Sequence, residues 1–169
     1  MRLFFALWPP RETARLLSQW AREAQRRCGG RATAEESIHL TLAFLGDADP
    51  ARALAAAQGV EAGDFELPIE TACHWRHNNI VWAGPQSTPR ALETLVEALQ
   101  LALFREQFIL ERRAFAAHVT LIRKVSDPAS LPGLPAIRWP ATEFVLVRST
   151  PANAGSRYQT VQSFPLSAA

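Results

Sequence analysis

The sequence contains few of the residues on which several large classes of protein depend. Among its 169 residues there is one lysine, Lys124, and there are two cysteines, Cys28 and Cys73. Two cysteines cannot build the dense disulfide framework of a small secreted protein, and they are typical of a chain kept in a reducing cytosol. A single lysine also argues against a lysine nucleophile charged by a nucleotide, as in ATP-dependent nucleic acid ligases.

Long apolar runs and glycine-rich loops are also missing. The apolar run at residues 3–8 is stopped by Pro9 and Pro10, and it is too short for a secretory signal or a membrane span. The chain has no Walker-type loop, no Gly-x-Gly-x-x-Gly, no Gly-x-Ser-x-Gly and no paired-cysteine zinc signature. We therefore expect a cytoplasmic protein with no membrane attachment and no cofactor.

The charge of the chain is nearly balanced. A formal net charge of +2 does not by itself indicate a nucleic-acid partner. The arginines at residues 22–31 fit a solvated helix face. A second basic group brackets the second motif described below and is favoured as part of a binding site: Arg112, Arg113, Arg123 and Lys124.

A four-residue pattern occurs twice in the chain, 79 positions apart. The two copies are His39-Leu40-Thr41-Leu42 and His118-Val119-Thr120-Leu121. With four histidines and ten threonines in the chain, chance predicts roughly 0.2 His-x-Thr triplets. Because alternate residues of a strand share a face, each copy would present an imidazole and a hydroxyl on one face and bury its apolar residues on the other.

Two histidines on facing strands would form an acid–base pair. An imidazole has an ordinary pKa of about 6.5, so one ring can act as base while another acts as acid. A single histidine on a strand is more often structural, but a structural role gives no reason for the repeat. The hydroxyls of Thr41 and Thr120 would flank the pair, an arrangement that suits phosphoryl chemistry.

The pattern of apolar residues predicts a mixed arrangement of helices and strands. Helices are expected over 12–28, over about 50 to 59 or 63, and from a cap at Thr88 and Pro89 onward. Strands are expected at 2–8, 38–45, 65–75, 79–84, 115–123, 142–149 and 157–165, with a proline-rich loop after the second motif. This order predicts a single α+β domain over residues 1–169, with antiparallel sheets and two similar halves along the chain.

Other candidate site residues are less specific. His74 and His77 beside Cys73 invite a metal interpretation, but no acidic or thiol cluster completes a coordination sphere, and a place at a hairpin near the cleft is favoured. Trp75 and Tyr158 are candidates for stacking on a nucleobase, whereas core packing is favoured for Trp82 and Phe44.

With these motifs the sequence resembles the 2H phosphoesterase superfamily, and within it the bacterial RNA 2′,3′-cyclic phosphodiesterases, historically also called 2′–5′ RNA ligases. The resemblance covers nearly the whole chain. Beyond the two motifs it includes the opening residues 2–7, the first motif extended through residues 43–46, residues 75–84, Ile122 with Arg123, and residues 155–158. It implies a two-lobed α+β fold with two antiparallel sheets and flanking helices, related by a pseudo-twofold axis around a central cleft.

The resemblance also implies roles for the site residues. A 2′,3′-cyclic phosphate at an RNA end or on a small nucleotide would be opened to a 2′-phosphate without a metal. His39 would be the proton donor and His118 the proton acceptor, although the nearly equivalent motifs do not themselves fix that order. Thr41, Thr120 and Arg123 would bind the phosphate. Arg123 lies five residues after His118, so a twist, bulge or strand end must bring it to the same face.

Two alternatives remain open at this stage. Ligation of cyclic-phosphate and 5′-hydroxyl RNA ends through a 2′–5′ bond is the same chemistry in reverse, so the same residues would serve it. Hydrolysis is favoured because water is far more concentrated than any RNA end. A non-catalytic module that binds RNA ends is the other alternative, and it leaves the repeated histidine unexplained. A monomer is expected.

Overall fold

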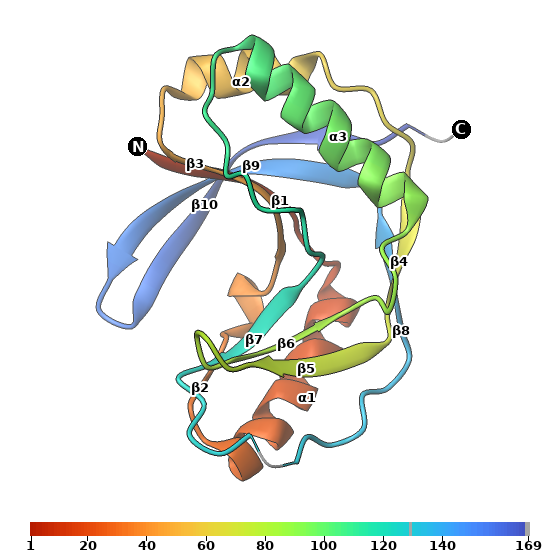
Figure 1. Ribbon diagram of the computed structural model, residues 1–169, viewed down its shortest axis with the longest axis vertical. Coiled ribbons are helices and arrows are strands. Elements are labelled where there is room, and N and C mark those ends of the chain that lie inside the picture. The colour runs from red at the N-terminus through yellow and green to blue at the C-terminus, as the bar shows by residue number, and fades with distance from the viewer. Residues whose placement is uncertain (129, 168–169) are drawn as a thin grey trace.

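The computed structural model describes residues 1–128 and 130–167 (Figure 1). Its helices are α1 (Arg11–Cys28), α2 (Pro50–Gln58) and α3 (Arg90–Arg105), with a short 3-10 helix η1 (Glu35–Ser37). Its strands are β1 (Arg2–Leu7), β2 (Arg31–Ala32), β3 (Leu40–Asp47), β4 (Phe65–Ile69), β5 (Thr71–Trp75), β6 (Ile80–Gly84), β7 (Val119–Arg123), β8 (Ile137–Ala141), β9 (Glu143–Ala152) and β10 (Gly155–Pro165). None of the helices in this part of the chain is long and apolar enough to cross a membrane.

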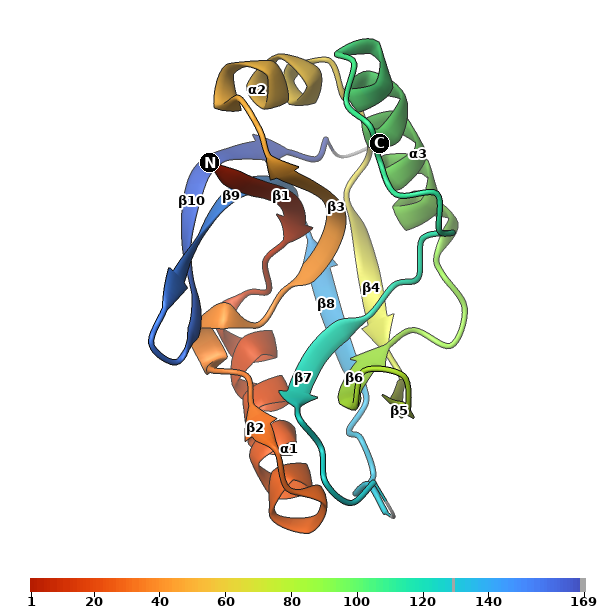
Figure 2. The same ribbon diagram turned by 60° about the vertical axis from the view of Figure 1, so that its left-hand side comes forward.

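The strands form two antiparallel sheets, which confirms the predicted α+β class. The larger has eight strands in the order β10-β9-β1-β3-β7-β6-β5, with β2 paired to β7, and the smaller pairs β4 with β8. The pairing of β3 with β7 consists of one residue pair, Leu40 with Val119. That pair joins a lobe carrying α2 and α3 to a lobe carrying α1, and β3 and β7 meet between the two (Figure 2).

The lobes are not the two halves of the chain that the sequence predicted. Helix α1 belongs to the first half, yet it packs on β2 and β7, the strands around the second motif. Helix α3 belongs to the second half, yet it packs on β3 and β4. Figure 1 shows the result, with α1 at one end of the molecule and α2 and α3 together at the other. The halves exchange helices because each amphipathic helix covers the strands of the other motif.

The predicted strand at 65–75 is divided in two. At Glu70 the chain leaves one sheet for the other, and β4 pairs with β8 while β5 pairs with β6. Strand β8 lies in the region predicted to be a proline-rich loop. Its buried residues alternate as Ile137, Trp139 and Ala141, and Pro140 is tolerated because this strand belongs to a two-stranded sheet with free edges.

The helix starts were predicted unequally well. The predicted start of α2 at residue 50 is confirmed, because Pro50 is the first helical residue. The helix is capped by Asp49, whose carboxylate accepts a hydrogen bond from the Ala51 N–H at 3.0 Å. The predicted start of α3 was wrong by one residue. Pro89 has an extended ψ of 144°, so it is the cap itself, and Thr88 makes no capping hydrogen bond.

Candidate active site

The two His-x-Thr motifs meet at the centre of the large sheet. Leu40 and Val119, the middle residues of the two motifs, pair directly across β3 and β7, and both are fully buried. Since neighbouring side chains point to opposite faces, the histidine and threonine on either side of this pair point to the opposite face of the sheet. The structure therefore brings all four motif side chains to one face, around a local pseudo-twofold axis between Leu40 and Val119.

Each motif strand contains a bulge at the same position of its motif. In the pairing with β1, Thr41 and Ala43 have partners and Leu42 has none. In the pairing with β6, Thr120 and Ile122 have partners and Leu121 has none. A residue inserted in this way shifts the alternation of the side chains that follow it. The two bulges are a feature that the repeat in the sequence does not show.

The bulge at Leu121 explains the position of Arg123. Leu121 and Ile122 are both fully buried, and Arg123 is exposed on the face that carries His118 and Thr120. The positive charge of Arg123 accordingly acts on both motif histidines. The sequence required a twist, a bulge or a strand end to bring Arg123 to the site, and the structure supplies a bulge.

The bulged strand is held by a residue that the sequence analysis did not single out. The Thr33 hydroxyl donates to the Thr120 carbonyl oxygen at 3.0 Å, and the Thr33 N–H donates to the Leu121 carbonyl oxygen at 2.8 Å. Arg31, two residues earlier, lies directly opposite Arg123. Arg31 was predicted to belong to a solvated helix face. Its place beside the site could not be predicted, because the pairing of β2 with β7 joins residues about 90 positions apart.

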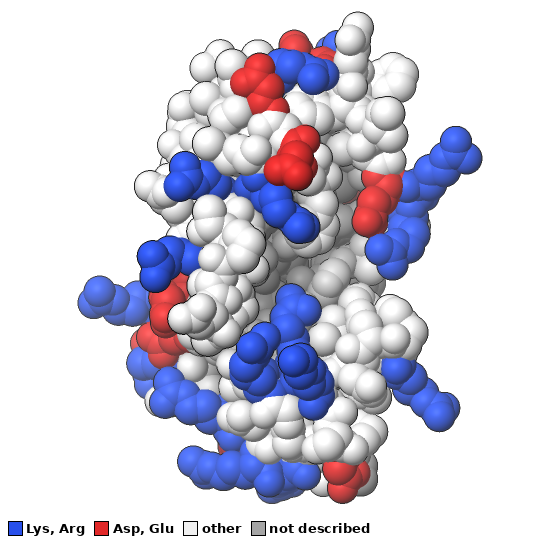
Figure 3. All heavy atoms as spheres, turned by 90° about the vertical axis from the view of Figure 1, so that its left-hand side faces the viewer, with Lys and Arg blue, Asp and Glu red and all other residues white. Residues whose placement is uncertain are grey.

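Positive charge surrounds the site. Arg31 and Arg123 are cross-strand neighbours, and the hairpin between β9 and β10 brings Gly155 close to the Arg31 guanidinium. Figure 3 shows lysine and arginine side chains on both sides of a hollow across the middle of the molecule. Like charges placed side by side repel each other, so this arrangement favours an anionic ligand between them.

Both histidines use the same ring nitrogen, Nδ1, for a hydrogen bond to the backbone. The Nδ1 of His39 lies 2.7 Å from the Ser37 carbonyl oxygen, and the Nδ1 of His118 lies 2.8 Å from the Ala116 carbonyl oxygen. A carbonyl oxygen can only accept, so each Nδ1 carries the hydrogen. In the neutral ring Nε2 is then left without a proton and can accept one, and in the charged ring Nε2 can donate one.

The rings around the two histidines differ. His39 is stacked on Trp8, with ring centroids 4.8 Å apart and planes 8° apart, and it also contacts Phe4 and Tyr158. His118 contacts Trp75 at 4.6 Å with the planes tilted by 58°, and Trp82 edge-on at 6.4 Å.

Burial lowers the pKa of both motif histidines. For His39 it lowers the pKa from 6.5 to about 4, assisted by the charges of Arg123 and His118 and opposed by the hydrogen bond to Ser37. Burial also lowers the pKa of His118, again assisted by Arg123 and opposed by the hydrogen bond to Ala116. Both rings are therefore neutral at pH 7 in the free protein.

The predicted stacking residues lie beside the histidines, one on each side. Trp75 contacts His118, and Tyr158 meets His39 edge-on. The expectation of core packing was wrong for Phe44, which is 60% exposed. The bulge at Leu42 places Leu42 and Ala43 toward the core and turns Phe44 outward, where it contacts Phe4.

The residues beside Cys73 do not form a cluster of ligands. Cys73 and His74 are consecutive residues of β5 and point to opposite faces, while His77 lies in the turn before β6. Within residues 1–128 and 130–167, no group of three or more histidine, cysteine or acidic side chains is arranged to hold a metal ion.

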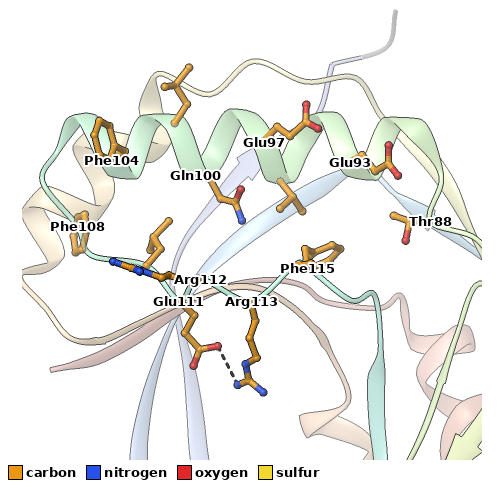
Figure 4. Close-up of a pocket in the computed structure, with 14 residues that line it drawn as sticks. Thr88, Glu93, Glu97, Gln100, Phe104, Phe108, Glu111, Arg112, Arg113 and Phe115 are labelled. Carbon is orange, nitrogen blue, oxygen red and sulfur yellow. Dashed lines mark hydrogen bonds and ion pairs between the residues drawn. The ribbon is translucent and has the colours of Figure 1, made fainter.

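A cavity of about 840 Å³ lies apart from the motifs, between α3 and the segment that leads to the second motif (Figure 4). Its wall mixes aromatic rings such as Phe104 and Phe115 with charges of both signs, Glu93 and Glu97 on α3 and Arg112 on the segment. Neither motif contributes a side chain to it. The cavity is therefore separate from the candidate active site.

Comparison with known proteins identifies the family. A sequence profile described as LigT like Phosphoesterase matches residues 7–82. The chain is also 32% identical to the RNA 2′,3′-cyclic phosphodiesterase of Escherichia coli (strain K12), over 98% of this chain and 96% of that protein. The chain belongs to the LigT-like phosphoesterase family, which confirms the resemblance found in its sequence.

Solved structures of relatives have the same fold. E. coli LigT complexed with 3′-AMP superposes with a TM-score of 0.86 at 30% identity, covering 98% of this chain and 97% of that one. The apo form of E. coli LigT gives a TM-score of 0.87. The protein TT0787 of Thermus thermophilus, at 22% identity and a TM-score of 0.79, shows the shared fold alone.

Proposed function

We propose that this protein hydrolyses 2′,3′-cyclic phosphates at RNA ends or on small nucleotides to 2′-phosphates, by acid–base catalysis with two histidines and no metal. The observation that carries the proposal is the arrangement of two His-x-Thr motifs on one face, around the pair of Leu40 and Val119. Relatives in three organisms bear the name RNA 2′,3′-cyclic phosphodiesterase, which supports the same substrate class here.

In this reaction the two Nε2 atoms move the protons. His118, neutral and with a free Nε2, takes a proton from the attacking water. The water oxygen bonds to phosphorus and the bond from phosphorus to O3′ breaks. His39, protonated on Nε2, gives its proton to O3′, and the phosphate stays on O2′. The products leave the pair with His118 protonated and His39 neutral, so a proton exchange with solvent resets the site.

The other site residues would hold the phosphate. The hydroxyls of Thr41 and Thr120 would donate to its non-bridging oxygens from opposite sides of the pseudo-twofold axis. Arg123 would offset the charge that builds as water adds. The bound anion would also raise the pKa of each histidine, against the effects of burial and of Arg123.

We extend the proposal to the substrate's base and to the protein's setting. Trp75 and Tyr158, each beside one histidine, would contact a nucleobase by stacking, which tolerates any base. Their flanking positions fit an RNA end that lies across the pseudo-twofold axis. We also propose that residues 1–169 act as one domain, that the protein is a monomer, and that it works in the cytoplasm.

The decisive experiment identifies the product of a nucleoside 2′,3′-cyclic phosphate in the presence of EDTA. We expect turnover to be unaffected by the chelator and the product to carry a 2′-phosphate, as resolved by phosphorus NMR. Loss of turnover on chelation would contradict the metal-free mechanism. A 3′-phosphate would mean that O2′ leaves and would contradict the proposed reaction.

A second experiment with the same protein distinguishes hydrolysis from ligation and from binding without turnover. RNA with a cyclic-phosphate end and RNA with a 5′-hydroxyl end are supplied together, and the joined and hydrolysed products are counted. We expect hydrolysis to dominate, because water and the 5′-hydroxyl RNA end compete for the same site and water is present at a far higher concentration. A joined 2′–5′ product as the main outcome would establish ligation, and binding of the RNA end without turnover would establish a binding module.

The pH dependence of kcat/KM should be shifted to the acid side. Both histidines of the free protein have lowered pKa values, to about 4 for His39 and below 6.5 for His118, and the reaction needs one of the two protonated. As the pH falls from about 7.5 to about 5, the singly protonated form becomes more populated, so kcat/KM should rise. At still lower pH, where both rings are charged, kcat/KM should fall again.

The pH optimum of kcat should differ from that of kcat/KM, because the bound substrate carries a negative charge. The kcat profile reports on the complex, in which the anionic phosphate raises both pKa values, so its optimum should lie at higher pH than that of kcat/KM. Steady-state rates measured from pH 4 to pH 9 in buffers of constant ionic strength check both features. A kcat/KM profile that is flat or still rising above pH 7.5 would contradict the prediction.

A further inference from the structure

The two motif histidines have matching backbone contacts and unmatched ring contacts. Each Nδ1 donates to the carbonyl oxygen two residues earlier, with nearly equal distances of 2.7 and 2.8 Å. Only His39 has an aromatic plane lying parallel to its own, that of Trp8, among the ring contacts of the two residues. The ring nearest to His118, that of Trp75, is tilted by 58° to the imidazole plane and does not stack on it.

Trp8 is held in place from several sides. It follows the last residue of β1, and the next two residues, Pro9 and Pro10, lead into α1. The two prolines limit the backbone angles of this connection, including those of Trp8 itself. Tyr158 of β10 meets the indole edge-on, with centroids 5.9 Å apart and planes at 76°. The indole therefore has little freedom to leave the His39 ring.

Trp8 lies beside a cavity as well as beside His39. A cavity of about 350 Å³ is lined by Trp8, Pro9 and Pro10 together with residues of β8, β9 and β10, and His39 is not part of its wall. Trp8 thus contacts the cavity and the imidazole at once. A smaller side chain at position 8 would join the cavity to the face of the His39 ring and admit water there.

We propose that Trp8 is a positioning residue that makes the two histidines unequal. Its indole fixes the plane of the His39 imidazole and keeps water from one face of it, so that the His39 proton passes to the substrate rather than to solvent. His118 lacks such a cover and remains open to the water that it activates. This inference rests on the proposed function for its chemistry, and it goes further by assigning the asymmetry that the two equivalent motifs leave open.

The charged groups around His39 limit how far its pKa can rise when Trp8 is removed. Arg123 of β7 and His118 lie within electrostatic reach of its ring, and Tyr158 of β10 contacts the ring edge. Phe4 and Trp8, on the side of β1, carry no charge. Because burial is the largest cause of the lowered His39 pKa and Arg123 would stay in place, removing Trp8 should restore the pKa only partly.

The first test follows the two histidines by proton–carbon NMR of their Cε1–H groups during a pH titration. The signals are assigned with His39→Gln and His118→Gln. In Trp8→Ala we expect the His39 midpoint to rise by on the order of one pH unit, with the His118 midpoint unchanged, and in Trp8→Phe we expect an intermediate value. This readout needs no turnover, so it tests Trp8 even if the proposed function fails.

The second test is kinetic. For a nucleoside cyclic phosphate we expect Trp8→Ala to lower kcat on the order of tenfold with a small change in KM, to move the acid limb of the kcat/KM profile to higher pH, and to be largely rescued in Trp8→Phe. Phe104→Ala is the matched control, since it removes a 74% exposed ring from α3, away from the motifs.

Several results would overturn the inference. An unchanged His39 midpoint in Trp8→Ala would show that the indole does not shield the ring. Equal shifts of both histidines would show a general loosening of the cleft rather than a specific contact. If Trp8→Ala does not fold, Trp8→Phe and Trp8→Leu take its place, and wild-type midpoints in both would contradict the inference.

Discussion

Replacing either motif histidine with alanine should lower kcat for a nucleoside 2′,3′-cyclic phosphate by about 10²- to 10⁴-fold. Each substitution removes one of the two groups that move protons in the proposed reaction. The double variant His39→Ala/His118→Ala should lose little more than the worse single variant, because both proton transfers serve the same transition state. Steady-state rates at saturating substrate measure the effect.

His77→Ala is the matched control for this pair, because His77 lies in the turn before β6, outside the motifs, and its ring contacts Trp75 rather than either motif histidine. It should retain wild-type kcat. Circular dichroism should show that all four variants are folded. If His39→Ala or His118→Ala keeps more than about a tenth of the wild-type kcat, then that histidine is not an obligatory acid or base.

Replacing Thr41 or Thr120 with valine should lower kcat/KM by about 10²-fold, the usual effect of losing one preorganised donor to a developing negative charge. Valine has nearly the same shape as threonine, so the change removes the hydroxyl and keeps the packing of the strand. Because the two threonines occupy equivalent motif positions on the two sides of the pair of Leu40 and Val119, the two losses should be similar.

Thr94→Val provides the comparison, since Thr94 is exposed on α3 and belongs to neither motif. It should leave kcat/KM unchanged. A loss of less than about threefold in both motif variants would show that the hydroxyls do not hold the phosphate. A large loss in one variant alone would show that the phosphate binds on one side of the pseudo-twofold axis.

The histidines and threonines of the candidate site could be predicted from the sequence because each motif is a short local pattern. A histidine and a threonine two positions apart share a strand face whatever the rest of the fold does, and a repeat of that pattern indicates a shared role. Buried residues such as Leu40 and Val119 were likewise visible from the pattern of apolar residues. Their direct pairing was not visible, because it depends on how two distant strands align.

The features that escaped prediction depend on long-range pairing. The bulges at Leu42 and Leu121 are defined against β1 and β6, and the position of Arg123 follows from one of them. Arg31 joins the site only through the pairing of β2 with β7. The exposure of Phe44 has the same origin, since a bulge reversed the face on which an apolar residue was expected.

The exchange of helices between the lobes has a consequence for the way the chain folds. A cut between β6 and α3 would give two fragments, and neither would contain both a motif strand and the helix that covers it, because α1 packs on β7 and α3 on β3. Each lobe can close its core only after the other half of the chain has been made. Native structure and the pairing of the two motifs should therefore appear together in one cooperative transition, without a half-folded form that already holds a working histidine pair.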